Sequence, residues 1–246
     1  MSGGTEREPI FNAPGVILVT SVVLIAIQAV MSYLSDDVAY NYALMLGLVP
    51  ARYADVDVLI PGGALAAYIS PFTHMLLHGD WLHALFNVAW FAAFGTMLAR
   101  RMSAIRFLAF AIVSGLGGAL AFAIFNWGLA TPMIGASGAI AGLFGGMLRV
   151  LAVVRPLRDP QERSVALLYY PIPALRYCLT DRLVLALLGM FIGLNLLSGT
   201  PFFESMAGGS IAYEAHLGGL ATGFFLAPFF DPQRQMPGWL TPTPSA

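Results

Sequence analysis

The segment PMIGASGAIAGLFGGML, residues 132–148, places one hydroxyl group, that of Ser137, in an otherwise apolar run rich in glycine. Three of its glycines recur at every fourth position and share one face of a helix: Gly138, Gly142 and Gly146. A face of small residues lets a second helix approach closely and is typical of helix pairs in membranes. The segment therefore predicts a membrane helix, over about residues 136–154, with a polar side chain near its start.

The composition of the whole chain indicates a bilayer environment. Of 246 residues, 58% are hydrophobic and only 10% are charged, which is too little polar surface to coat a soluble protein of this size. The net charge of −1 argues against a nucleic-acid partner. Cys178 is the single cysteine, so an intramolecular disulfide is excluded and redox chemistry is not expected. No residue pattern calls for a cofactor.

Six apolar segments are long enough to span a hydrocarbon core, which needs about 20 helical residues. We predict an all-α integral membrane protein with one six-helix domain over residues 15–230. Its cytoplasmic tails are residues 1–14 and 231–246, and a long external loop, 35–77, joins helices one and two. The predicted helices are 15–34, 78–99, 105–127, 136–154, 182–200 and 211–230.

The arginines predict the orientation of the helices. All basic residues are arginines, and most lie between helices two and three or around the loop between helices four and five. Only Arg52 falls on the opposite side, which carries mostly acidic residues. Because positive residues concentrate on the cytoplasmic side, we expect both termini in the cytoplasm. The compact form and short tails favour a bacterial inner membrane.

Polar side chains within three of the predicted helices lie at similar depths. They are His83 and Asn87 in HGDWLHALFN, Ser137 in GASG, and His216 in AHLGGLATG. At about 1.5 Å per residue, counted from the inner helix ends, these four residues lie about 18 to 25 Å up. Polar groups in spans usually face a bundle interior or a water-filled cavity. We therefore expect them to share one layer in the outer half of the bilayer.

A chemical role follows from this shared layer. Small residues at 215, 219 and 223 give the sixth helix a face that matches the one after Ser137, so a Ser137–His216 hydrogen bond is geometrically plausible. A neutral histidine can accept the proton of a serine nucleophile. His83 and Asn87 lie four residues apart on one helix face and could donate together to an oxyanion.

At these three motifs the chain resembles the rhomboid family of intramembrane serine proteases, over about residues 65–230. The resemblance implies a Ser137–His216 dyad without a third carboxylate and an oxyanion hole that uses His83 and Asn87. It also implies transmembrane protein substrates in the lipid bilayer. Family members often carry an aromatic residue four positions after the serine, where this chain has Ala141.

Other interpretations stay open. A catalytically silent relative would bind membrane proteins without cleaving them, and a small transporter would also use broken helices and buried polar groups. A metalloprotease would draw on His74, His78 and His83, but Met75 follows His74 where the zinc motif has glutamate, so no metal is expected. Three further polar residues are interpreted as helix-packing or interface residues: Ser114, Asn195 and Glu214.

Overall fold

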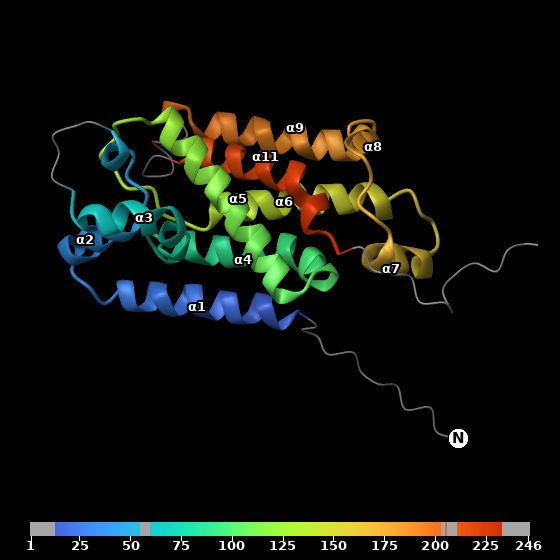
Figure 1. The fold of residues 1–246 in the computed structure, drawn as a ribbon, viewed down its shortest axis with the longest axis horizontal. Coiled ribbons are helices and arrows are strands. Elements are labelled where there is room, and N and C mark those ends of the chain that lie inside the picture. The colour runs from blue at the N-terminus through green and yellow to red at the C-terminus, as the bar shows by residue number, and fades with distance from the viewer. Residues whose placement is uncertain (1–12, 55–59, 203–204, 206–210, 233–246) are drawn as a thin grey trace, which may run out of the picture.

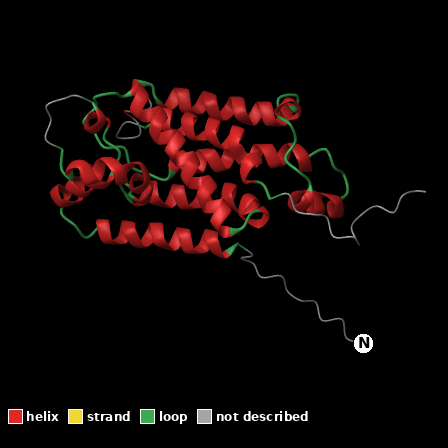
Figure 2. Ribbon diagram, in the orientation of Figure 1, coloured by secondary structure: helices red, strands yellow, loops and turns green. Residues whose placement is uncertain are grey.

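A computed structural model describes residues 13–54, 60–202, 205 and 211–232, and within these ranges the chain is helical without a β-strand (Figure 2). Nearly all of the predicted tails, residues 1–12 and 233–246, lie outside the described residues. Two extended segments form one isolated bridge between Leu48 and Met133. The all-helical class predicted from the sequence is therefore confirmed for the described part of the chain.

A helix lies in each of the six segments predicted to span. Three of them, α4, α5 and α6, are long and apolar enough to cross a membrane. Two others, α1 and α9, are shorter apolar helices of 17 residues each, and α11 has 18 residues. The bounds are α1 (Gly15–Met31), α4 (Trp81–Arg101), α5 (Ala104–Phe125), α6 (Ser137–Val154), α9 (Arg182–Ser198) and α11 (Tyr213–Phe230).

Shorter helices cluster at the two ends of this bundle (Figure 1). The described parts of the segment 35–77, residues 35–54 and 60–77, are folded, with α2 (Asp36–Leu46) and α3 (Gly63–Thr73) at one end of the bundle. At the other end lie α7 (Pro160–Tyr169) and α8 (Leu175–Cys178). Two 3-10 turns, Pro50–Tyr53 and His74–Leu76, also lie in the chain between α2 and α4.

The central helix is α6, most of which is buried against α4, α5 and α11. Its small-residue face meets that of α11, as the glycine spacing predicted. A Cβ atom on Gly219 would overlap the carbonyl oxygen of Gly138, and one on Gly223 would overlap that of Gly142. The two backbones are therefore in direct contact, which brings side chains near the starts of both helices together.

A buried ion pair connects the helices at the other end of the bundle, where α4 and α11 end. Arg101, at the end of α4, is only 1% exposed and pairs with Asp231, which follows α11, at 2.5 Å. Its guanidinium also donates to the carbonyl oxygens of Leu167 and Tyr170 at the end of α7. One buried side chain thus ties α4, α7 and α11 together.

Candidate active site

Ser137 is the first residue of α6 and follows a loop that is held from two sides. Met133 and Leu48 exchange backbone hydrogen bonds of 2.8 and 2.9 Å. The N–H of Gly135 donates to the carbonyl oxygen of His74 at 2.9 Å. Gly135 has a φ of +124°, a conformation that side chains disfavour. The glycine thus lets the loop turn sharply into the helix start that carries Ser137.

His216 lies in the first turns of α11 and faces Ser137. Its Nε2 atom is 2.7 Å from the Ser137 Oγ atom, a hydrogen-bond distance between residues 79 positions apart. Both side chains are partly exposed rather than sealed in the core. The structure therefore brings together the two residues that the sequence predicted to be neighbours.

The second nitrogen of His216 has a partner that sequence reasoning missed. Nδ1 of His216 lies 2.7 Å from Oδ1 of Asn195 on α9, a residue interpreted from the sequence as a packing residue. The same count of helical rise from the inner helix end could have identified Asn195. Asn195 lies 13 residues above Arg182 at the inner end of α9, and so about 20 Å up. That is the layer predicted for Ser137 and His216.

His83 lies in the first turn of α4. Asp80 caps this helix by accepting the His83 N–H at 2.7 Å, which fixes where His83 lies in the first turn. A Cβ atom added to Gly135 would lie 2.9 Å from His83 Nε2 and 3.7 Å from Ser137 Oγ. The His83 ring nitrogen and the serine hydroxyl therefore border the same small space at Gly135.

Asn87 lies one turn further along α4 and is 5% exposed. Its Nδ2 atom donates to the carbonyl oxygen of His83 at 2.8 Å, within its own helix. Because an amide nitrogen carries two hydrogens, one N–H of Asn87 is left for a further acceptor. Ser137 is not a hydrogen-bond partner of Asn87 in the described structure, so the predicted role of Asn87 depends on a bound group between the two residues.

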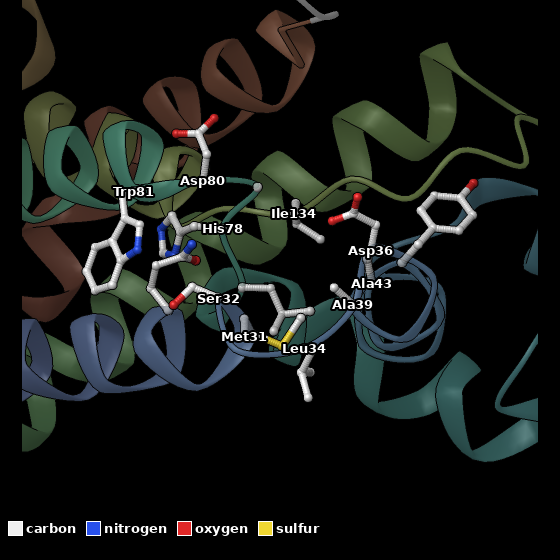
Figure 3. Close-up of a pocket in the computed structure, with 14 residues that line it drawn as sticks. Met31, Ser32, Leu34, Asp36, Ala39, Ala43, His78, Asp80, Trp81 and Ile134 are labelled. Carbon is white, nitrogen blue, oxygen red and sulfur yellow. The ribbon is translucent and has the colours of Figure 1, made fainter.

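A cavity of about 400 Å³ opens beside this cluster, between α1, α2 and the start of α4 (Figure 3). His78 lines it and meets the His83 ring edge-on at 5.1 Å between ring centroids. Ile134, in the loop before Ser137, lines it as well. Neither Ser137 nor His216 borders this cavity, so it adjoins the serine without containing it.

The histidines of the region form no metal site in the described part of the chain, where no three His, Cys, Asp or Glu residues are grouped to hold an ion. His74 is 1% exposed and contributes its carbonyl oxygen to the loop before Ser137. The geometry instead offers a serine, a histidine base and nearby N–H donors, the components of nucleophilic acyl chemistry.

Comparison with known proteins identifies the family of the chain. Residues 66–232 match the rhomboid domain family. The chain belongs to the rhomboid family. Rhomboids are generally serine proteases that act on membrane proteins within the bilayer. The rhomboid domain and the apolar helices together indicate a multi-pass integral membrane protein.

One curated relative is RHOMBOID-like protein 4 of Arabidopsis thaliana, which is 30% identical over 150 residues. The aligned region covers 61% of this chain and 31% of the plant protein. The chain therefore corresponds to about a third of the length of that relative.

Proposed function

We propose that this rhomboid is an intramembrane serine endopeptidase that cleaves the transmembrane segments of other membrane proteins. The observation that carries the proposal is the 2.7 Å contact between Ser137 Oγ and His216 Nε2. The contact joins α6 and α11, whose backbones touch at glycines. The short distance therefore depends on the packing of the two helices as well as on the conformations of the two side chains. A hydroxyl paired with an imidazole is the arrangement that activates a serine nucleophile.

The proposed reaction has two stages, formation of an ester on Ser137 and hydrolysis of that ester. Ser137 Oγ attacks the carbonyl carbon of the scissile peptide bond while its proton passes to Nε2 of His216. The tetrahedral intermediate collapses, the C–N bond breaks, and His216 gives that proton to the leaving nitrogen. Water, deprotonated by His216, then attacks the carbonyl carbon of the Ser137 ester. The ester C–O bond breaks, His216 returns the proton to Ser137 Oγ, and the second product leaves as a carboxylic acid.

The oxyanion of the intermediate would lie in the space at Gly135. His83 Nε2 borders this space, and the free N–H of Asn87 is available from the next turn of α4. Donors aimed at developing negative charge lower the barrier of acyl transfer. The first N–H groups of α6 lack partners within their helix and add to the positive potential beside Ser137.

The proposed topology has six spans, with both termini in the cytoplasm and the domain over residues 15–230. The arginines at the ends of α4 and α6 and in α7 and α8 support this orientation, because they collect at one end of the bundle. In this orientation Ser137 and His216 lie in the outer half of the bilayer, and the segment 35–77 lies outside. A bacterial inner membrane is the proposed location.

The test is labelling of the detergent-purified full chain with a fluorophosphonate probe, which reacts with activated serines. Wild type should be labelled, and both Ser137→Ala and His216→Ala should lose the label. Ser114→Ala is the matched control, because Ser114 is a buried serine on α5 without a hydrogen-bond partner for its hydroxyl. This variant should keep the label.

Cleavage of a membrane substrate completes the test. Each variant is reconstituted into vesicles with a tagged single-span protein that wild type cleaves, and the fragments are followed by gel electrophoresis. Cleavage by a folded Ser137→Ala variant would contradict the proposal. Absence of labelling in folded wild type would instead favour a catalytically silent relative that binds membrane proteins without cleaving them.

A further inference from the structure

The imidazole of His216 has hydrogen-bond partners on both sides, contributed by two different helices. Nε2 contacts Ser137 of α6 and Nδ1 contacts Asn195 of α9, both at 2.7 Å. In a neutral imidazole one nitrogen carries a proton and the other accepts one. The partner at Nδ1 therefore decides whether Nε2 is free to act as the base for Ser137.

The orientation of the Asn195 amide follows from its second contact. Its Nδ2 atom donates to the carbonyl oxygen of Phe191, one turn earlier on α9, at 2.8 Å. The flipped amide would set Oδ1 against that carbonyl oxygen, which places two acceptors together. Oδ1 therefore faces His216 and requires a hydrogen on Nδ1, which leaves the lone pair of Nε2 directed at the serine hydroxyl.

The position of Asn195 is fixed by packing between α6 and α9. Phe191 stacks on Phe144 of α6 with ring centroids 4.9 Å apart and an interplanar angle of 21°. Phe144 lies on the same helix as Ser137, and Phe191 lies on the same helix as Asn195. The stacked rings thus set the height of α9 relative to α6 and hold the amide at the level of the dyad.

We propose that Asn195 is a positioning residue that holds His216 in the tautomer with the proton on Nδ1, so that the site is a Ser137–His216–Asn195 array. This inference rests on the proposed protease function and extends it to α9. A neutral amide fixes the tautomer and ring orientation without adding a negative charge to the site. Cysteine proteases use an asparagine behind their histidine in the same way.

Two substitutions at Asn195 separate positioning from packing. Asn195→Leu and Asn195→Asp both remove the Nδ2 donor to Phe191, but only Asp keeps an oxygen acceptor for Nδ1. If Asn195 only packs, Leu is the milder change in this apolar helix and Asp the harsher one. The proposal requires the reverse order. Leu194→Ala is the control, because the neighbouring Leu194 side chain is 58% exposed.

The first readout is the limiting rate of fluorophosphonate labelling at saturating probe, separated from probe affinity. We expect Asn195→Leu to lower this rate by about tenfold or more, and Asp to restore most of it. Leu194→Ala should label at the wild-type rate. Equal rates for wild type and Asn195→Leu would overturn the proposal, as would equal loss in the Leu and Asp variants.

The second readout does not depend on activity. The chain has four histidines, so nitrogen-15 NMR of histidine-labelled protein gives few signals, and His216→Ala assigns those of His216. We expect a protonated Nδ1 in wild type and a mixture of tautomers in Asn195→Leu. If wild type carries the proton on Nε2, the inference fails even where labelling succeeds. If wild type is unlabelled but Nδ1 is protonated, only the proposed function fails.

Discussion

Gly138 of α6 and Gly219 of α11 meet so closely that a Cβ atom on Gly219 would overlap the Gly138 carbonyl oxygen. Gly138 follows Ser137 directly, and Gly219 lies three residues after His216. The short distance between the side chains of Ser137 and His216 therefore depends on two residues that carry no side chain. The packing of α6 against α11 therefore also sets the geometry of the candidate site.

Gly219→Ala should weaken both stability and reactivity. The added methyl group must push α11 away from α6, which costs about 1 to 3 kcal/mol for overpacking and lengthens the Ser137–His216 contact. We expect fluorophosphonate labelling to fall by about tenfold or more. Gly189→Ala on α9 is the control, since nothing lies within 4 Å of its added Cβ. Full labelling of Gly219→Ala would show that the helix contact does not set the site.

Gly135→Ala should abolish labelling while leaving the bundle folded. The new Cβ would lie 2.9 Å from His83 Nε2, in the space proposed for the oxyanion. Loss of one oxyanion donor costs about 100-fold or more in related chemistry. Gly128→Ala separates this effect from backbone strain, because Gly128 also has a positive φ, +83°, but open space around it. Similar labelling of the two variants would contradict the oxyanion assignment.

Asp231→Ala should destabilise the bundle far more than loss of a surface pair. It leaves the buried Arg101 guanidinium without its carboxylate, and breaking a buried pair costs about 3 to 5 kcal/mol. Asp181→Ala would be a poor comparison because Asp181 also caps α9, so Arg155→Ala is used instead. Arg155 is 43% exposed, and its pair with Asp181 should contribute about 1 kcal/mol or less. Unfolding in detergent measures both, and equal losses would contradict the prediction.

Single cysteines should reveal the orientation of the helices. Ser35, between α1 and α2, and Ser164, in α7, are both exposed serines at opposite ends of the bundle. In a Cys178→Ser background, Ser35→Cys should react with an impermeant maleimide in intact cells. Ser164→Cys should react only after permeabilisation. The opposite pattern would reverse the proposed topology.

Native Cys178 should itself react slowly with maleimide. Its side chain is fully buried, and burial raises the pKa of the Cys178 thiol, with Arg149 acting in the opposite direction. Because the thiolate is the reactive form, a raised pKa and a buried sulfur both slow the reaction. Rapid labelling of native Cys178 in folded protein would contradict the burial of α8 against α6.

Much of the fold was predictable because hydropathy and helical periodicity are local properties of the chain. The six apolar segments each contain a helix, and α6 spans residues 137–154 where 136–154 was expected. For the arginines, the sequence predicted only the side of the membrane on which they lie and not their contacts. Arg101 was counted as a cytoplasmic charge, yet it lies buried against Asp231, a residue 130 positions away.

The sequence by itself determined which chemical groups are present and how far apart they lie along each helix, because residue type and helical rise follow from the chain alone. Its matching small-residue faces also predicted a contact between Ser137 and His216. Only the tertiary structure decided that Asn195 completes the hydrogen-bond array, and that His83 faces Gly135. Those contacts depend on how each helix is rotated about its axis and which neighbour it packs against, and these are settled by interlocking side chains far apart in the chain.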